Sequence, residues 1–441
     1  MLHGAGAFPP EIAASVAAFI AGRTESVPLG RTRSPSEVDP LLHGSITSDG
    51  LGAVEAWRLF GERVVANTVG LDSERFLAFI PAAPSAASVW MDAAVSAASF
   101  SAESWLEAAG AVAAENRVLR WFADLVGFPA GAGGCFVSGG SIGNLSALAV
   151  ARDRAGDRTT VAVSDTAHSS VANSLRLLGL DRVVRVPTSD DGRFTGELLR
   201  RALDGRDDVG IIVASAGSTN AGVVDDLAGL ADVADESNAW FHVDGAYGAA
   251  ALLLVEQRHR FAGLERADSL IVDPHKWLFA TLGSCALLYR DPTLAAAVHT
   301  QRGPYIDVLH GDEPLWNPSD YAMQLTRRAS GLPLWFSLAT HGVDAHAEAV
   351  RAGVALAARA ARVLESVPGV SLVMEPELGV VLFRRRGWGA PEWGAWADSL
   401  LADGVAFVAP SRWKGETVGR LVFLHPSTPV SLIDEIARRL A

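Results

Sequence analysis

The stretch VGIIVASAG (residues 209–217), with AWFHVDGA (239–246) and DSLIVD (268–273) after it, decides the fold. Each segment is a short run of bulky apolar residues that ends in small or acidic ones. A segment of helical pattern, LAGLADVADES (227–237), separates the first two. Apolar strands that alternate with helices are typical of a mainly parallel sheet with helices on its faces. The sequence therefore predicts an α/β fold.

The same alternation extends in both directions, from residue 134 to residue 289. It includes the apolar runs TVAVS (160–164) and SCALLYR (284–290). Upstream of it, apolar residues at helical spacing predict two helices within residues 86–126, the second of which stops at Gly127.

We expect three parts in the chain. Residues 1–85 form an N-terminal helical arm, broken by the Pro- and Arg-containing connector PLGRTRSPSEVDP. Residues 86–330 form the large α/β domain, and residues 331–441 form a long helix followed by a small α+β domain. The strands predicted in that last domain are GVVLFRRR (379–386), VAFVAP (405–410) and RLVFLHP (420–426).

Composition limits the kinds of function. The 37 basic and 50 acidic residues give a net charge of −13 without long runs of one sign, which argues against nucleic acid or an anionic membrane as partner. The two cysteines, Cys135 and Cys285, are too few for a disulfide framework or a zinc site and fit a reducing cytoplasm. The N-terminus lacks the basic region of a signal peptide, and no uninterrupted apolar run reaches about 18 residues. We expect a cytoplasmic protein with no bound metal.

A Gly- and Ser-rich turn follows the apolar run that begins at Cys135. In CFVSGGSIGNLSALAV (135–150), Gly140 and Ser141 lie between a predicted strand and a predicted helix. Free N–H groups and the positive end of a helix can hold an anion such as a phosphate there. Because such turns are common, an ordinary strand-to-helix connection is an equal alternative.

Three more polar residues follow apolar runs. They are Asp244 in AWFHVDGA, His168 in DTAHSS (165–170) and Lys276 in DPHKW. Taken singly, each has an ordinary alternative: a helix cap, a structural histidine and a surface lysine. Ligands of open α/β sheets bind at the carboxyl ends of the strands, so we expect these side chains to converge.

Together these residues match what pyridoxal phosphate requires. That cofactor needs a lysine for a Schiff base, an acid at its ring nitrogen, a flat group on its ring face and a cradle for its phosphate. Lys276, Asp244, His168 and the turn at Gly140 supply one of each. An aspartate beside the ring nitrogen raises the pKa of that nitrogen, which makes the ring a strong electron acceptor.

The chain resembles a known family at these positions. The motifs SGGSIGNLSAL, DTAHSSVANSLRLLGL, HVDGAYG and DSLIVDPHKW are similar to those of the pyridoxal-phosphate-dependent group II amino-acid decarboxylases, which include aromatic-L-amino-acid and glutamate decarboxylases. The resemblance runs from about residue 80 to residue 425. It implies fold type I, the aspartate-aminotransferase-like fold with a mainly parallel seven-stranded sheet. It also implies a homodimer with active sites at the interface, and conversion of an L-amino acid to its amine and carbon dioxide.

The resemblance also implies roles for single residues. Lys276 forms the Schiff base, Asp244 pairs with the ring nitrogen and His168 stacks on the ring. Ala246 packs on the opposite face, and Thr219 lies near the phenolic oxygen and the substrate carboxylate. The implied phosphate ligands are Gly140, Ser141, Asp273, His275 and Ser269; Asn144 either assists them or caps the following helix.

A tyrosine in a loop is the implied proton donor. In the family it reaches in from the partner subunit and protonates Cα after carbon dioxide has left. The corresponding loop here is HTQRGPYIDVLHGDEPLWNPSD (299–320), and its tyrosine is Tyr305, which could instead merely pack. Arg327 and Arg328 resemble a family motif beside the active site, with helix-surface cations as the equal alternative.

The substrate side chain is less well defined. The family's pocket wall corresponds to residues 78–104, and the candidates there are Phe79, Ile80, Pro81, Ala82, Ser101 and Glu103. Overall similarity favours an aromatic substrate, whereas a Glu103 directed into the pocket would suit a cationic one.

Two other functions compete with simple decarboxylation. One keeps the cofactor but yields an aldehyde by oxidative deamination, or cleaves a carbon–carbon bond of a β-hydroxy amino acid. The other is a non-catalytic protein that binds the cofactor or a partner. The second predicts a lost lysine or aspartate, and both Lys276 and Asp244 are present.

Overall fold

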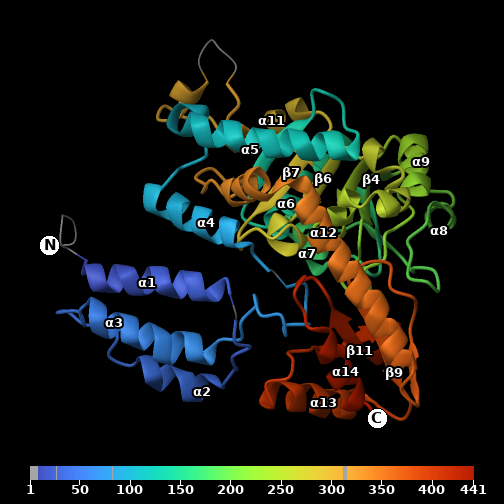
Figure 1. The fold of residues 1–441 in the computed structure, drawn as a ribbon. Coiled ribbons are helices and arrows are strands. Elements are labelled where there is room, and N and C mark those ends of the chain that lie inside the picture. Colours follow the sequence, from blue (N-terminus) through green and yellow to red (C-terminus); the bar gives the residue numbers. More distant parts are fainter. Residues whose placement is uncertain (1–7, 26, 82, 311–314) are drawn as a thin grey trace.

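The computed structural model describes residues 8–25, 27–81, 83–310 and 315–441. Figure 1 shows an N-terminal group of helices, a large layered α/β unit and a smaller C-terminal unit with its own sheet. In the described ranges, no helix combines the length and the apolar character needed to cross a membrane.

The large unit is organised around one sheet. Within the described residues this sheet has seven strands in the order β1-β7-β6-β5-β4-β2-β3. The strands are β1 (Gly133–Val137), β2 (Thr160–Ser164), β3 (Val183–Val186), β4 (Val209–Ser215), β5 (Trp240–Asp244), β6 (Ser269–Val272) and β7 (Cys285–Tyr289). The pairs from β3 to β6 are parallel, and β7 runs antiparallel to β1 and β6. The predicted mainly parallel seven-stranded sheet is confirmed.

Both faces of the sheet are buried, as the apolar strands predict. Along β4, Ile212 and Ala214 belong to one apolar core, and Ile211 and Val213 belong to the core on the opposite face. This alternation follows from the two-residue period of a strand. The α-helices of this unit are α5 (Trp105–Val126), α6 (Gly140–Ala155), α7 (Ser169–Leu177), α8 (Gly196–Ala202), α9 (Leu227–Ser237), α10 (Pro274–Trp277) and α11 (Pro292–His299).

The N-terminal helices are α1 (Pro10–Arg23), α2 (Pro35–Val38), α3 (Ala53–Leu59) and α4 (Ala86–Ala98). The two helices predicted within residues 86–126 are α4 and α5, so that prediction is confirmed. Gly127 ends α5 in a left-handed conformation with φ of 86°, and its N–H donates to the carbonyl oxygen of Ala123. Glycine adopts this conformation without steric cost, which explains the stop.

A long helix, α12 (Leu332–Glu365), leads into the C-terminal unit. The second sheet there consists of β8 (Val370–Leu372), β9 (Val380–Arg385), β10 (Ser411–Trp413) and β11 (Glu416–Val422). The unit also contains the helices α13 (Ala390–Ala402) and α14 (Val430–Arg438). The strand predicted at 405–410 is wrong. Only Phe407 forms a bridge there, to Phe76, because this segment pairs with the chain near Arg75 and Leu77 and not with the sheet.

A buried acid links α5 to the start of α12. The side chain of Glu115 accepts a hydrogen bond of 2.7 Å from the N–H of Gly331. Burial raises the pKa of Glu115 to about 7, although that bond and the charge of Arg327 oppose the rise. A carboxyl whose pKa is higher in the folded chain than its usual 4.5 stabilises the fold below about pH 4.5 and loses that contribution as the pH rises to about 7.

Replacing Glu115 by glutamine should therefore change how stability depends on pH. Glutamine keeps the acceptor for Gly331 but cannot ionise, so we expect Glu115→Gln to gain stability relative to the wild type between pH 5 and pH 8, by up to roughly 3 kcal/mol. Urea unfolding of both proteins across this range measures the difference. The exposed Glu365, at the end of α12, provides the matched control Glu365→Gln. A constant difference between Glu115→Gln and wild type would contradict the prediction.

Candidate active site

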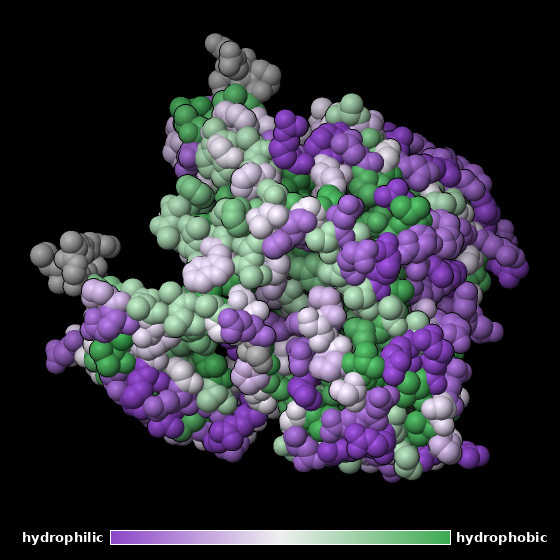
Figure 2. Space-filling model, in the orientation of Figure 1, coloured by the Kyte–Doolittle hydropathy of each residue, from purple (hydrophilic) through white to green (hydrophobic). Residues whose placement is uncertain are grey.

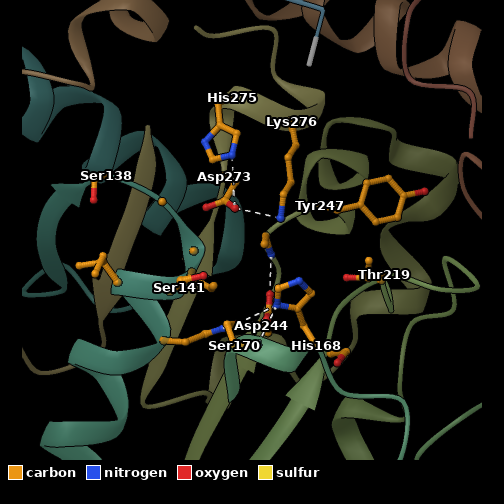
Figure 3. Close-up of a pocket in the computed structure, with 18 of the residues that line it drawn as sticks. Ser138, Ser141, His168, Ser170, Thr219, Asp244, Tyr247, Asp273, His275 and Lys276 are labelled. Carbon is orange, nitrogen blue, oxygen red and sulfur yellow. Dashed lines mark hydrogen bonds and ion pairs between the residues drawn. The ribbon is translucent and has the colours of Figure 1, made fainter. Parts of the chain in front are cut away.

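The sequence-predicted cofactor residues line one cavity of about 410 Å³. They follow strands of the large sheet at their carboxyl ends, as Figure 3 shows. The residues brought together are Gly140, Ser141, His168, Thr219, Asp244, Ala246, Asp273, His275 and Lys276. Asn144, on α6, lines the same cavity.

Lys276 lies in the short helix α10, which begins directly after β6 and Asp273. Its Nζ is 2.9 Å from Oδ2 of Asp273, the ion pair drawn in Figure 3. Burial alone would lower the pKa of Lys276, but the charges of Asp273 and Asp244 outweigh it and hold that pKa above its usual value. Burial would likewise raise the pKa of Asp273, and the charges of Lys276 and His275 lower it instead. Without cofactor, Lys276 is therefore protonated and forms an ion pair with the ionised Asp273.

The start of α6 forms the anion cradle. The first N–H groups of a helix have no partner inside it, and α6 begins at Gly140 on the cavity wall. A Cβ on Gly140 would come within 2.8 Å of Oδ2 of Asp273, so only glycine lets the helix approach this closely. The ring of His275 is held by a 2.6 Å contact between its Nδ1 and the carbonyl oxygen of Ser284.

The predicted phosphate ligands differ in what they can offer. Ser269 is an incorrect assignment: it is fully buried at the start of β6, bonded to Trp240 and His242, and is not on the cavity wall. Asp273 is on the wall, but an ionised carboxylate only accepts hydrogen bonds, and here it pairs with Lys276. This geometry favours Asp273 as the partner of the lysine, and its role toward a phosphate stays a prediction.

Asp244 and His168 lie on the opposite side of the cavity from Lys276, as Figure 3 shows. Each oxygen of Asp244 has a donor: Oδ1 accepts from the N–H of Ala246 at 3.1 Å and Oδ2 from Nδ2 of Asn144 at 3.0 Å. His168 caps α7, and its Nδ1 lies 2.8 Å from the hydroxyl of Ser170. Asn144 therefore anchors the acid and does not cap α6, which begins before it.

Thr219 is positioned from the C-terminal unit. Nη2 of Arg420, on β11, donates to the carbonyl oxygen of Thr219 at 2.6 Å, and its Nε donates to that of Asn220 at 3.0 Å. Burial lowers the pKa of Arg420 to about 10. No local pattern in the sequence predicts this contact, because it joins residues from distant parts of the chain.

Tyr247 is a cavity residue that the sequence reasoning missed. Its ring stacks on Trp277 at 5.1 Å between centroids, and its hydroxyl accepts a 2.7 Å hydrogen bond from the N–H of Gly379. Burial raises the pKa of Tyr247 well above its usual value. A signal was present, since Tyr247 directly follows Ala246 in HVDGAYG.

The predicted proton donor and substrate residues do not line this cavity in the single chain. Tyr305 is 75% exposed, and Phe79 is 59% exposed and packs against Phe76 and Phe407. Ile80 and Pro81 pack inward, Ser101 and Glu103 contact each other at 3.4 Å, and Ala82 lies outside the described residues. Their roles stay predictions.

Arg327 and Arg328 are not helix-surface cations, because they precede α12 in an irregular segment. Arg327 is buried and donates from Nη1 to the carbonyl oxygen of Phe136 at 3.2 Å. Arg328 pairs with Asp92 at 2.7 Å. Both line a cavity of about 220 Å³ whose wall shares Ser138 with the main one.

The donor set fits pyridoxal phosphate. It joins an amine at a strand end, a buried carboxylate with anchored oxygens, an imidazole at the wall and a helix start that only glycine allows. The fold and the site together define an enzyme that uses pyridoxal phosphate.

Comparison with known proteins specifies the class further. The family model described as "Pyridoxal-dependent decarboxylase conserved domain" matches residues 61–386, and the chain therefore belongs to this family of pyridoxal-dependent decarboxylases. An aromatic-L-amino-acid decarboxylase of Bacillus atrophaeus is 32% identical, over 94% of this chain and 90% of that protein. An L-2,4-diaminobutyrate decarboxylase of Rhizobium meliloti is 34% identical, over 78% and 74%. The crystal structure of Oryza sativa TDC with PLP and tryptamine superposes with a TM-score of 0.90 at 25% identity, covering 98% of this chain and 99% of that one.

These findings confirm the family, the fold and the cofactor that the motifs predicted. The protein is a pyridoxal-phosphate-dependent amino-acid decarboxylase, and its reaction releases the carboxyl group of an amino acid as carbon dioxide.

Proposed function

We propose that the enzyme converts an aromatic L-amino acid to its amine and carbon dioxide. The observation that carries this choice is the charge of the cavity wall. Among the described wall residues, the carboxylates are Asp244 and Asp273, and both are committed to other groups. Apolar side chains such as Ile142 and Leu282 share the wall. This cavity therefore offers a cationic side chain no free carboxylate, and Glu103, the acid that would suit one, lies outside it.

The relatives include decarboxylases of both an aromatic and a cationic amino acid, and the two similarities differ in coverage. The similarity to the aromatic-L-amino-acid decarboxylase covers 94% of the chain, and that to the L-2,4-diaminobutyrate decarboxylase covers 78%. A bound aromatic ring would also gain free energy from contact with apolar wall residues.

The chain's own residues have separate tasks in this reaction. Bound pyridoxal phosphate would supply an electron-accepting ring that takes up the electron pair left when the bond from Cα to the carboxylate breaks. Asp244, with both oxygens anchored, stabilises positive charge at the ring nitrogen. Lys276 would hold the cofactor through its amine and would give it up to the amino group of the substrate. Tyr305 then gives its phenolic proton to Cα, which yields the amine.

Carbon dioxide release from a panel of amino acids tests the substrate class. The panel contains the proteinogenic L-amino acids and L-2,4-diaminobutyrate. We expect kcat/KM for at least one of tryptophan, tyrosine and phenylalanine to exceed that for L-2,4-diaminobutyrate at least about tenfold, because a buried unpaired cation is strongly disfavoured. Preference for the diamine would overturn the proposal. Glu103→Gln should leave the preference unchanged if Glu103 does not meet the substrate.

We also propose that the enzyme acts as a cytoplasmic homodimer in which Tyr305 serves the neighbouring subunit. Both cysteines are free and buried, in keeping with a reducing compartment. Apolar side chains are exposed on α4 and the start of α5, among them Trp90 at 43% and Leu106 at 62%. In Figure 2, many residues over this side of the molecule are coloured as hydrophobic. A second copy that covers this side would remove these side chains from water.

Exposure singles out Tyr305 among the tyrosines. The sequence contains four, all in described parts of the chain. Tyr247, Tyr289 and Tyr321 are at most 9% exposed, and Tyr305 is 75% exposed. Tyr305 is thus the tyrosine whose hydroxyl can enter another subunit's cavity without disruption of a core.

Replacing Tyr305 by phenylalanine should change the product. Without its phenolic proton the reaction stalls before Cα is protonated, and oxygen can then divert it to the aldehyde. We expect amine formation to fall about 10²-fold or more, with aldehyde, ammonia and hydrogen peroxide in its place. Product analysis in air and under argon measures this, and amine formation at the wild-type rate would remove Tyr305 from the mechanism.

Mixed dimers test whether Tyr305 acts between subunits. Neither Lys276→Ala nor Tyr305→Phe should form amine efficiently as a homodimer. After co-refolding of equal amounts, about half of the dimers are mixed, and each mixed dimer has one cavity with an intact lysine and an intact tyrosine from the other chain. We therefore expect amine formation by the unseparated mixture to return to up to roughly a quarter of the wild-type level. No recovery in dimers verified to be mixed would show that Tyr305 acts within its own chain.

A further inference from the structure

A series of buried hydrogen bonds runs beneath the cavity and links Asp244 to His168 through Asn144 and Ser170. Nδ2 of Asn144 donates to Oδ2 of Asp244 at 3.0 Å and to the hydroxyl of Ser170 at 2.9 Å. Oδ1 of Asn144 lies 2.9 Å from Nε2 of His242. The side chains of Asn144 and His242 are at most 1% exposed, so water does not compete for these bonds.

The direction of these bonds is fixed at the acid. A carboxylate can only accept, so the group of Asn144 that faces Asp244 is its NH₂ and the group that faces His242 is its oxygen. Nε2 of His242 therefore carries the proton. Burial lowers the pKa of His242, so its ring is neutral and its Nδ1 is a bare acceptor.

At the other end of this hydrogen-bond series, Trp240 and Ser269 require the same donors and acceptors in His242. The indole N–H of Trp240 can only donate, and it does so to the hydroxyl of Ser269 at 2.9 Å. That hydroxyl lies 2.8 Å from Nδ1 of His242 and can give its own proton there. The indole of Trp240 can only donate and the carboxylate of Asp244 can only accept. Starting from either group gives the same result, with the proton of His242 on Nε2.

The arrangement continues to His168. The backbone N–H of Ser170 donates to Nδ1 of His168 at 3.2 Å, and the hydroxyl of Ser170, which accepts from Asn144, lies 2.8 Å from the same nitrogen. Nδ1 is then an acceptor, and the proton of a neutral His168 is on Nε2.

We propose that Asn144, oriented by His242, is a positioning residue that holds Asp244 and the hydroxyl of Ser170 in place beneath the cavity. The neighbouring His168 is kept by the N–H of Ser170 as the tautomer with its proton on Nε2. The ring at the cavity wall then presents an N–H donor on its side away from Ser170. This proposal concerns the same cofactor site as the proposed function and rests on it. The tautomer of His168 is set by the protein alone, so it can be measured without cofactor or substrate.

Nitrogen NMR of the full-length enzyme tests the tautomer with and without cofactor. The protein is labelled with ¹⁵N-histidine and measured at pH 8, and the His168 signals are assigned from their loss in His168→Gln. We expect a protonated Nε2 and a bare Nδ1 in the wild type. In Asn144→Leu the N–H of Ser170 still donates to Nδ1, so Nε2 should keep the proton, and the His168 signals should shift only because the hydroxyl of Ser170 has lost the N–H of Asn144. A wild-type His168 with its proton on Nδ1 overturns the proposal.

Variants of His242 test the positioning of Asp244 by cofactor affinity. Glutamine can keep a donor toward Asn144, whereas leucine cannot. We expect His242→Leu to weaken pyridoxal phosphate binding about tenfold, the equivalent of one lost hydrogen bond, and His242→Gln to stay within about threefold of wild type. His346→Leu is the matched control, because His346 is also buried but bonds to Ser337 and Gly342 on α12.

The outcomes separate this proposal from the proposed function. Equal affinities in His242→Leu and wild type, with both proteins folded by circular dichroism, would show that His242 does not orient the acid. Equal losses in His242→Leu and His346→Leu would reduce its role to packing. A wild-type enzyme that keeps the Nε2 proton on His168 but prefers L-2,4-diaminobutyrate would refute the proposed substrate and leave the network intact.

Discussion

The variant Lys276→Ala should have no measurable turnover, with kcat reduced at least about 10⁴-fold. Lys276 is expected to bind the cofactor covalently and to exchange it with the substrate, so its loss removes both steps at once. The structure adds a second effect, because Asp273 loses its partner at 2.9 Å and becomes a buried carboxylate without a counter-charge. We therefore expect weaker cofactor binding as well as lost chemistry.

The chain allows an unusually clean control for this experiment. Lysine occurs at positions 276 and 414 only. Lys414 is exposed and pairs with Asp190 at 3.0 Å, far along the chain from the cavity residues. Borohydride reduction of the wild type and of Lys414→Ala should fix the cofactor to the peptide that contains Lys276. Covalent cofactor in reduced Lys276→Ala, or full activity of that variant, would refute the assignment.

The second large effect is expected for Asp244. Asp244→Asn keeps the size of the side chain but removes the charge that is proposed to stabilise the protonated ring nitrogen, and we expect kcat to fall about 10³-fold or more. The donors from Asn144 and Ala246, which now hold two carboxylate oxygens, would also face an amide with one oxygen.

Asp244→Glu separates charge from position. It restores the charge at the end of a longer side chain, so partial recovery over Asp244→Asn would show that charge matters most. The absorption spectrum of the bound cofactor gives a reading independent of turnover, because its dependence on pH should shift in Asp244→Asn. Activity within tenfold of wild type in Asp244→Asn would exclude Asp244 from the role proposed for it.

Local pattern was enough to predict the sheet and the cavity. The alternation of apolar runs with helical segments holds from β1 to β7, and Gly127 ends α5 as its residue type implies. The convergence of the candidate cofactor residues on one cavity was predictable because each follows a strand, and parallel strands place their ends together. The motifs also carried the family resemblance.

Contacts that depend on register between distant segments were not predictable. Ser269 has the composition of a phosphate ligand, but the pairing of β5 with β6 places it opposite His242, at the far end from the cavity. Residues 405–410 have the apolar pattern of a strand, but their neighbour is the segment around Arg75. Neither fact can be found in the residues next to these positions.

The pairing of β5 with β6 also explains why the buried network was missed. His242 and Asp244 are two residues apart on one strand and so face the same side, which was a usable signal. The hydrogen-bond partners of His242 are Asn144 on α6 and Ser269 on β6. Their convergence is a property of the packed sheet.

The cavity and the predicted substrate residues occupy different parts of the chain. The candidate cofactor residues follow the strands of the large sheet, whereas Phe79, Ser101 and Glu103 lie outside that cavity. We therefore predict that mutations at residues 79–103 change which amino acid is accepted and leave the cofactor cavity intact. Such a layout makes substrate choice easy to change over evolution, and directed evolution for new amines should begin at residues 79–103 rather than at the strand ends.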